Sequence, residues 1–157
     1  MPQLSFLSPY GDLTVSEEDG VIVALDWGRS PFQETTAVLN EAKAQIDAYF
    51  DGDLRTFDLP IEAHGTVFQQ KVWAALRAIP YGSAKSYGDL ASVLSTHARA
   101  IGMACGRNPV PILIPCHRIL GIHGSLGGYS AGEGPETKAA LLRLEGISFR
   151  ARDPELF

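Results

Sequence analysis

The 157-residue sequence contains only two cysteines and no long hydrophobic run. Cys105 and Cys116 alone do not make the disulfide framework of a small secreted protein, so reduced thiols are expected. The longest apolar stretches, such as Val21–Leu25, are far shorter than the ~20 residues needed to cross a bilayer. The first ten residues lack the basic and apolar segments of a secretory signal peptide. We therefore expect a cytoplasmic protein that does not associate with membranes.

The composition is that of a folded globular protein. Apolar residues make up 45% of the chain and charged residues 20%, which argues against disorder. A chain of this length buries enough surface to fold without a metal or a disulfide. The spacing of Cys105, Cys116, His117 and His123 fits no common zinc pattern, so we expect no metal and no cofactor.

The net charge of −5 is distributed unevenly along the chain. Residues 1–61 contain 3 Lys/Arg and 11 Asp/Glu, whereas residues 62–157 contain 10 Lys/Arg and 7 Asp/Glu. Between His64 and Ser130 there are six basic residues and a single acid, Asp89. An anionic partner would therefore contact the middle of the chain, although an ordinary mixed surface explains the same counts.

The first 60 residues predict a small sheet with one helix. Residues 12–16 and 21–27 are rich in β-formers, and the Asp-Gly pair between them is typical of a tight hairpin turn. Apolar residues at helical spacing predict a helix over 36–50. Residues 55–59 are predicted as a further strand, followed by a linker.

The pattern becomes helical after Gly65. Thr66 and Gln69 have the capping-box spacing, and a helix is predicted from there to Ile79. Two short helices follow, one starting at Ser86 and one over 97–106, and a last helix is predicted over 135–145. Two short helices joined by a turn are typical of a helix-turn-helix, although most such hairpins never contact DNA.

Pro115–Arg118 carries the most reactive combination of side chains in the sequence. A free cysteine is most often a small core residue, and Cys116 lies between two apolar runs. His117 and Arg118 make a positive neighbourhood, which favours a thiolate, and a cysteine beside a base is the minimum for nucleophilic catalysis. Both interpretations of Cys116 are compatible with this tetrapeptide alone.

The wider sequence resembles the O6-alkylguanine-DNA alkyltransferases, which transfer an alkyl group from damaged guanine to their own cysteine. The likeness is dense over residues 57–146. It is carried by Phe68–Trp73, Ile79–Gly82, Ser86–Tyr87, Ala98–Gly102, Asn108–Pro109, Ile114–Arg118, Gly128–Ser130 and Leu144–Gly146.

This resemblance implies an α/β (α+β) fold in two parts. Residues 1–60 would form a ribonuclease-H-like subdomain with a small sheet and a helix. Residues 61–157 would form a winged helix-turn-helix domain that carries the Pro-Cys-His-Arg site. The implied activity is a single irreversible transfer per molecule, on double-stranded DNA bound as a monomer through the minor groove and the phosphates.

The resemblance also assigns catalytic roles. Cys116 would accept the alkyl group, and His117 and Glu145 would complete a relay, through a water, that keeps the sulfur ionised. A carboxylate near the C-terminus of a helix is otherwise poorly placed, because the helix dipole is negative there. Tyr87 would donate a hydrogen bond to the departing guanine, which needs a proton as it leaves.

A second set of residues would bind DNA or the extruded base. Arg99 would fill the gap left by the flipped nucleotide, with Ala98, Ala100 and Gly102 allowing close approach in the minor groove. Asn108 would tie the cysteine loop to the helix-turn-helix. The base-binding and DNA-binding positions that remain are Arg118, Ile119, Tyr129 and Ser130, with Ile119 acting through its backbone carbonyl.

Two points stay open in the sequence. The step from Tyr87 to Arg99 is twelve residues, two fewer than is usual in the family, and it lacks the usual Gly-x-Pro turn. The two missing residues must shorten a helix end or the turn, which affects the angle of the second helix and with it the pose of Arg99. The alternative function is that of a non-catalytic alkyltransferase-like protein, which binds alkylated guanine and recruits other repair factors. Those relatives replace the nucleophile, whereas Cys116 is present here.

Overall fold

The computed structural model describes residues 1–127 and 134–150, and these form two compact units. The first unit comprises residues 1–64 together with 109–113, and the second begins at Gly65 and resumes at Ile114. The division after His64 lies a few residues beyond the predicted boundary at 60. The return of residues 109–113 to the first unit was not predicted.

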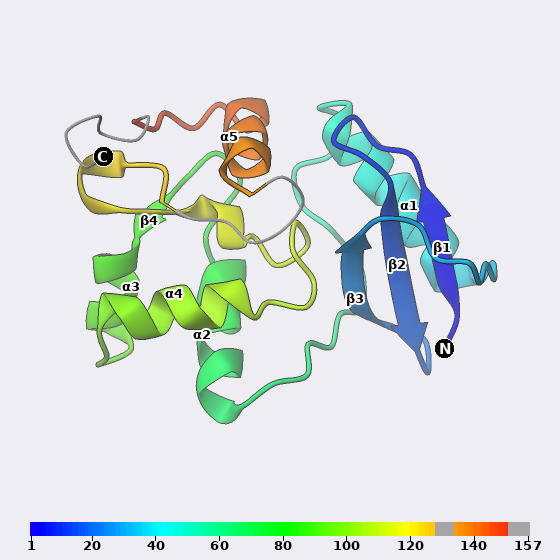
Figure 1. Ribbon diagram of the computed structural model, residues 1–157, viewed down its shortest axis with the longest axis horizontal. Coiled ribbons are helices and arrows are strands. Elements are labelled where there is room, and N and C mark those ends of the chain that lie inside the picture. Colours follow the sequence, from blue (N-terminus) through cyan, green and yellow to red (C-terminus); the bar gives the residue numbers. More distant parts are fainter. Residues whose placement is uncertain (128–133, 151–157) are drawn as a thin grey trace. The chain divides into compact units, whose positions relative to one another are not determined.

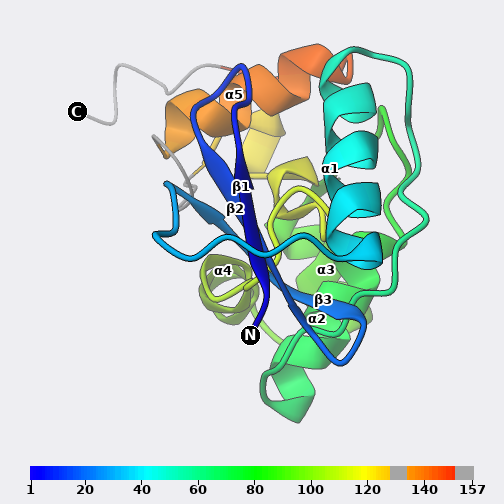
Figure 2. The same cartoon turned by 90° about the vertical axis from the view of Figure 1, so that its right-hand side faces the viewer.

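The first unit is an antiparallel three-stranded sheet covered on one face by a helix (Figures 1 and 2). The strands are β1 (Gln3–Phe6), β2 (Leu13–Glu18) and β3 (Val21–Trp27), in that spatial order, and the helix is α1 (Ala37–Phe50). Asp19 and Gly20 both have positive φ, which is the two-residue hairpin turn predicted between β2 and β3. The core side chains are Leu13, Val15, Ile22, Leu25, Leu39, Ile46 and Tyr49.

The strand predicted over 55–59 is wrong. The segment runs as coil. The Gln45 side chain of α1 both donates to the carbonyl of Asp58 and accepts from its N–H, so the backbone groups of Asp58 are paired without a ladder. The only ladder contact nearby is an isolated parallel bridge between Ile22 and Ile61. In the first unit, strand β1, which is only four residues long, was not predicted.

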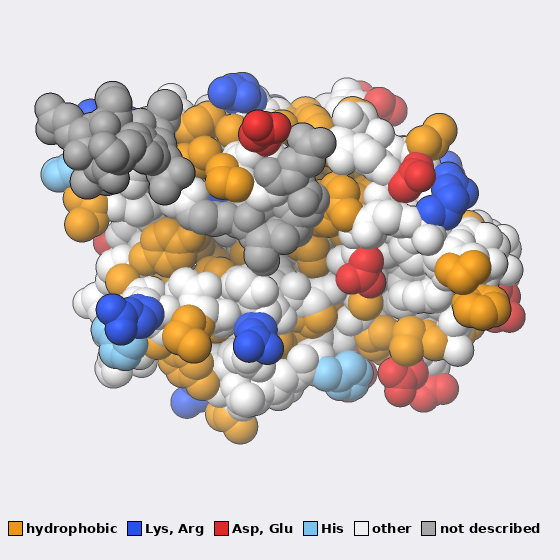
Figure 3. Space-filling view, viewed as in Figure 1, with side chains coloured by type: hydrophobic (Ala, Val, Ile, Leu, Met, Phe, Trp, Pro, Cys, Tyr) orange, Lys and Arg blue, Asp and Glu red, His pale blue; other side chains and the backbone are white. Residues whose placement is uncertain are grey.

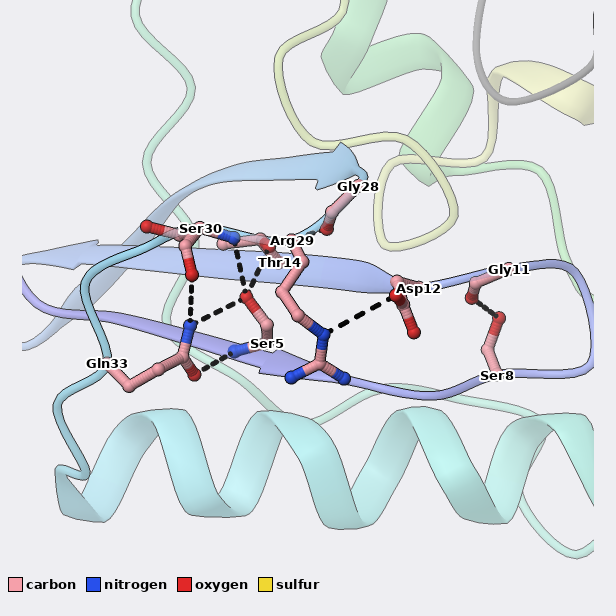
Figure 4. A network of polar contacts seen from close by, with 9 residues as sticks. All are labelled: Ser5, Ser8, Gly11, Asp12, Thr14, Gly28, Arg29, Ser30 and Gln33. Atoms are coloured by element: carbon pink, nitrogen blue, oxygen red, sulfur yellow. Dashed lines mark hydrogen bonds and ion pairs between the residues drawn. The ribbon is translucent and has the colours of Figure 1, made fainter.

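A polar network fastens the strands to the segment that follows β3 (Figure 4). The hydroxyls of Ser5 and Thr14 lie 2.7 Å apart, and the Thr14 hydroxyl donates to the carbonyl of Gly28 at 2.7 Å. Gln33 donates to the Ser5 hydroxyl and accepts from its backbone N–H, both at 2.8 Å. The buried hydroxyls of Ser5 and Thr14 are therefore both hydrogen-bonded, as burial requires.

The second unit is mainly helical. Its helices are α2 (Val67–Arg77), α3 (Tyr87–Val93), α4 (Ala98–Gly106) and α5 (Pro135–Leu144). The capping box predicted at Thr66 and Gln69 is present, and Ser86 and Asp89 form a second one at the start of α3. The indole N–H of Trp73 on α2 donates to the carbonyl of Ala104 on α4 at 2.9 Å, which joins these helices.

A short parallel ladder, β4 (Lys85–Ser86) with β5 (Ile119–Leu120), links two segments that lie far apart in sequence. Because Tyr87 follows β4 directly, this pairing brings the start of α3 beside the segment that follows Cys116. Within residues 1–127 and 134–150, no helix is long and apolar enough to cross a membrane.

The connection between α3 and α4 shows how the shortened segment is accommodated. α3 ends at Val93, Leu94 caps it, and Ser95 takes a left-handed conformation with φ +55°. The N–H of Thr96 then returns to the carbonyl of Ala91 at 2.9 Å, and His97 caps α4 through its imidazole. A serine in the left-handed region thus turns the chain without a glycine or a proline.

Candidate functional site

Cys116 begins a single 3₁₀ turn, η1 (Cys116–Arg118), at the end of the buried run Ile112–Ile114. Pro115 precedes the turn, and the Asn108 side chain donates to the carbonyl of Ile114 at 2.9 Å. This bond connects the end of α4 to the cysteine segment. Cys116 itself retains 6% exposure, so the residue is enclosed but not sealed.

The backbone before the cysteine is strained. Ile112 is buried and has φ +72°, a left-handed conformation that a β-branched residue rarely adopts. Such conformations persist only where the surrounding packing enforces them, and they gather at functional sites.

His117 and Glu145 form a fully buried pair. The Nε2 atom of His117 lies 2.7 Å from Oε2 of Glu145, and both side chains are 0% exposed. Glu145 caps the C-terminus of α5, and Gly146 follows it with φ +74°, as the predicted helix end requires. The structure therefore brings together two side chains that lie 28 positions apart in sequence.

This pairing fixes the state of the imidazole. Because a carboxylate only accepts, Nε2 must carry the hydrogen that it shares with Glu145, which leaves Nδ1 as the basic nitrogen of a neutral ring. Burial lowers the pKa of His117 below 6.5, and the hydrogen bond that its imidazole donates to Glu145 opposes this only in part. Within the described part of the chain, buried Nδ1 has no hydrogen-bond partner.

The prediction that Arg118 binds DNA needs correction. Its side chain is buried, its Nε donates to Oε1 of Glu145 at 2.8 Å, and a second nitrogen donates to Oε2 at 3.1 Å. A third nitrogen donates to the carbonyl of Ile79 at 2.7 Å. The guanidinium is therefore engaged inside the protein, where it holds the Glu145 carboxylate, and it does not face a phosphate.

Tyr87, the first residue of α3, is half-buried, and its hydroxyl lies beside a lysine. The ammonium of Lys138, on α5, is 3.5 Å from the Tyr87 oxygen and 5.5 Å from the centre of its ring. Burial raises the pKa of Tyr87 to about 12, with smaller contributions from Cys105 and Cys116. Tyr87 therefore stays a protonated hydrogen-bond donor at neutral pH.

Lys138 is the residue that sequence reasoning missed. It is 0% exposed, whereas lysines are almost never fully buried unless they are paired. The helical spacing of Lys138, Leu141, Leu142 and Glu145 places all four on one face of α5, and this face is buried. A lysine in helical register with Leu141 and Leu142 was the available signal.

A groove of about 630 Å³ lies beside Tyr87. Its walls include Tyr87, Arg99 and Gly102 from the helices and residues 121–124 from the turn after β5. Arg99 and Ala98 are exposed in the first turn of α4, and Ala100 and Gly102 are partly exposed. Figure 3 shows basic and histidine side chains among hydrophobic ones over α3 and α4. The groove thus presents a cationic and apolar surface to a ligand.

Of the remaining residues predicted to bind the base, the structure describes only Ile119. Ile119 lies in β5 and is fully buried, so only its backbone is available to a base. Tyr129 and Ser130 lie outside the described residues. In the described ranges, 1–127 and 134–150, no three His, Cys, Asp or Glu side chains come together as metal ligands would.

The geometry defines a two-part protein with a cysteine segment beside a buried His–Glu pair and a helical surface suited to nucleic acid. Comparison with known families matches residues 67–147 to the 6-O-methylguanine DNA methyltransferase DNA-binding domain. Residues 5–63 match the ribonuclease-like domain of the same methyltransferases. The chain belongs to the 6-O-methylguanine DNA methyltransferase family.

Individual relatives agree with this assignment over nearly the whole chain. The constitutive methylated-DNA–protein-cysteine methyltransferase of Bacillus subtilis is 43% identical, covering 92% of this chain and 95% of its own. The Mycobacterium tuberculosis methylated-DNA–protein-cysteine methyltransferase is 41% identical over 88% of both chains. The crystal structure of M. tuberculosis OGT in complex with DNA superposes with a TM-score of 0.83, at 40% identity over 92% of each chain.

Proposed function

We propose that this protein repairs O6-alkylguanine in DNA by transferring the alkyl group irreversibly to Cys116. The curated relatives named above are methylated-DNA–protein-cysteine methyltransferases. In the proposed reaction the Cys116 sulfur attacks the alkyl carbon, the bond from that carbon to O6 breaks, and guanine is restored. Each molecule reacts once, because the thioether has no route back.

The observation that supports the proposal most directly is the His117–Glu145 contact of 2.7 Å. Glu145 holds the hydrogen-bearing Nε2, so the basic Nδ1 is free to take the Cys116 thiol proton, through one water. This is the nucleophile, base and orienting acid arrangement of an activated nucleophile. Arg118 positions the carboxylate, and the N–H of Gly82 donates to it at 3.2 Å.

Tyr87 and the exposed face of α4 complete the proposed site. Tyr87 would donate to the guanine ring as the base departs. Arg99 would occupy the space of the extruded nucleotide, and Ala98, Ala100 and Gly102 would let α4 approach the minor groove. Asn108 would keep the cysteine segment in register with α4, and the carbonyl of Ile119, with Tyr129 and Ser130, would contact the base.

The proposed partner is double-stranded DNA, bound through its phosphates and its shape by a monomer acting in the cytoplasm. A relative of this chain has been crystallised in complex with DNA. Contacts to phosphate carry no sequence information, which suits a protein that must search for damage at any sequence.

A binding protein that does not transfer the alkyl group is the competing function. The two are separated by incubating the protein with a duplex that carries one O6-methylguanine, then measuring the intact protein mass and the retention of DNA. Transfer predicts a mass gain of one methylene and a repaired duplex. Tight binding with an unchanged mass would refute transfer.

A further inference from the structure

Tyr81 lies in the turn between α2 and β4, and two other residues of this turn bind the buried Arg118–Glu145 pair. The carbonyl of Ile79 accepts from a guanidinium nitrogen of Arg118 at 2.7 Å. The N–H of Gly82 donates to Oε1 of Glu145 at 3.2 Å. Tyr81 is therefore carried by a backbone segment that is fixed to the charged pair on which the proposed mechanism depends.

The Tyr81 side chain makes two further contacts with this pair. The centre of its ring lies 5.8 Å from the central carbon of the Arg118 guanidinium, which is a cation–π distance. Its hydroxyl donates to the carbonyl of Leu144 at 3.3 Å. Leu144 is the last residue of α5, where carbonyls lack partners within the helix, and Glu145 follows it directly. One side chain thus holds both the guanidinium and the backbone that carries the carboxylate.

Tyr81 also differs from the pair in its exposure. The side chains of Arg118 and Glu145 are 8% and 0% exposed, whereas Tyr81 is only partly buried. Because its ring contacts the guanidinium and also reaches the surface, it shields the guanidinium from water. Charged hydrogen bonds are stronger where water is excluded, so a smaller side chain at position 81 would weaken the pair.

The donors around Glu145 fix the rotation of its carboxylate. Oε1 accepts from Gly82 and from Nε of Arg118, the latter at 2.8 Å. Oε2 accepts from a second nitrogen of Arg118 at 3.1 Å and lies 2.7 Å from Nε2 of His117. A carboxylate held in this way keeps the imidazole hydrogen on Nε2 and leaves Nδ1 as the base.

We infer that Tyr81 is a positioning residue that fixes the Arg118–Glu145 pair and, through His117, sets the fraction of Cys116 present as thiolate. The inference rests on the proposed transfer to Cys116. In the step that Tyr81 supports, the thiol proton passes through one water to Nδ1 of His117, while Nε2 keeps its hydrogen bond to Glu145. The proton stays within the protein, and no further reactant is needed.

The test measures the alkylation of Cys116 by iodoacetamide between about pH 5.5 and 10, followed by the mass of the peptide that holds Cys116. Iodoacetamide reacts with the thiolate and needs no DNA. We expect Tyr81→Leu to slow alkylation about threefold at pH 7 and to raise the pH of half-maximal rate by about 0.5. At high pH, where the thiol ionises without help, the two rates should meet.

Tyr81→Phe keeps the ring over the guanidinium and removes only the hydrogen bond to Leu144. Its alkylation rate at pH 7 should fall by about twofold or less, with a correspondingly smaller rise in the pH of half-maximal rate. Methyl transfer at pH 7 and saturating DNA should fall by the same factors as alkylation in both variants. Thermal unfolding shows whether each variant keeps the fold, and Tyr81→Phe carries the test if Tyr81→Leu does not.

A spectroscopic measurement separates positioning from support of the fold. The ¹⁵N resonances of the His117 imidazole report which nitrogen carries the hydrogen. We expect the hydrogen on Nε2 in the wild type and a mixture of the two neutral forms in Tyr81→Leu. A rate that falls equally at every pH, with an unchanged imidazole, would show that Tyr81 only supports the fold and would overturn the inference. A wild-type profile in Tyr81→Leu would overturn it as well.

Tyr10→Leu is the matched control. Tyr10 is another partly buried tyrosine, in the first unit, where its ring contacts Phe50 with 5.2 Å between the centres. Its replacement should leave the pH of half-maximal alkylation unchanged.

The outcomes also separate the inference from the function on which it rests. A wild type that never acquires a methyl group from an O6-methylguanine duplex would refute the proposed function. Alkylation and the imidazole resonances would still report on Tyr81, because neither needs DNA. A wild type that transfers normally, with an unmoved profile in Tyr81→Leu, would refute the role of Tyr81 alone.

Discussion

Glu145 Oε2 lies 2.7 Å from Nε2 of His117, at the C-terminal end of α5 where the helix dipole disfavours a carboxylate. The compensation comes from Arg118, which donates to both oxygens of the same carboxylate. The Glu145 carboxylate is therefore stabilised by His117 and Arg118, and not by the dipole of the helix that carries it.

Replacing Glu145 by Gln should damage both stability and transfer. The substitution leaves the buried guanidinium of Arg118 without its counter-ion, and breaking such a pair typically costs about 3 kcal/mol or more. It also replaces the charged acceptor that orients the His117 imidazole, so methyl transfer should fall at least tenfold. Urea unfolding and single-turnover rates measure the two effects.

Glu136→Gln is the matched control, since Glu136 is exposed in the first turn of the same helix. It should cost no more than about 1 kcal/mol, through the dipole alone, and leave transfer unchanged. Equal effects of the two substitutions would contradict the role given to Glu145.

The stability of the protein should fall as the pH drops below 6.5, because of His117. Burial lowers the pKa of this imidazole in the folded state, so the unfolded chain binds more protons in mild acid. The free energy of unfolding therefore decreases on acidification and is retained at neutral pH. Urea unfolding between pH 5 and 7.5 should show this slope in the wild type.

His117→Gln should flatten that slope, because a carboxamide can still donate to Glu145 but does not titrate. His64→Gln, at an exposed histidine, should keep the slope of the wild type. If His117→Gln kept the slope and His64→Gln removed it, His117 would not be the group responsible for the pH dependence of stability.

Much of this fold could be predicted from local patterns. The Asp19–Gly20 hairpin, the capping box of α2 and the start of α5 at Pro135 are each encoded by a few neighbouring residues, and the structure confirms all three. Strand β1 was missed because it is only four residues long, and the coil at 55–59 was misjudged because Asp58 exchanges hydrogen bonds with the side chain of Gln45 on α1.

The site residues were also only partly predictable from the sequence. The likeness to a family pointed to Cys116, His117 and Glu145, but nothing local revealed that Arg118 turns inward to the carboxylate of Glu145. Lys138 was missed for a related reason, since a lysine is assumed to be exposed unless its helix face is considered. Tertiary contacts, rather than composition, decide which charged side chains are buried.

Ser95→Gly should stabilise the protein by about 0.5–1 kcal/mol, because glycine adopts the left-handed conformation without strain. The connection between α3 and α4 would keep its shape, so transfer should be unaffected. Chemical denaturation gives the stability change directly.

Ser92→Gly, three residues earlier inside α3, is the natural comparison and should destabilise the protein by a few tenths of a kcal/mol. The two glycine substitutions therefore have opposite signs. The same sign for both would mean that Ser95 is not strained in solution.

Arg99→Ala should slow repair of duplex DNA about tenfold or more, since an inserted side chain offsets the cost of extruding the base. Reaction with free O6-benzylguanine needs no extrusion and should change by less than about twofold. The measurement is the rate of reaction of the wild type and of Arg99→Ala, each with duplex DNA and with free O6-benzylguanine.

Arg107→Ala removes an exposed arginine at the other end of α4. It should weaken DNA binding in a salt-dependent way and leave the rate at saturating DNA unchanged.

For Arg99→Ala, a loss of reaction with the free base as well as with duplex DNA would contradict the role in base extrusion. It would indicate instead that Arg99 supports the base-binding pocket.

The most direct test of the account asks which cysteine carries the methyl group, and how many are transferred. Burial raises the pKa of Cys105 to about 12, so its thiol should stay protonated and unreactive. After incubation with excess O6-methylguanine duplex, peptide mass mapping of the wild type and of Cys105→Ser should show one methylene on the peptide holding Cys116. Cys116→Ser should bind the duplex and gain nothing. A methyl group on Cys105, or an unmodified Cys116 in the presence of excess lesion, would contradict the account.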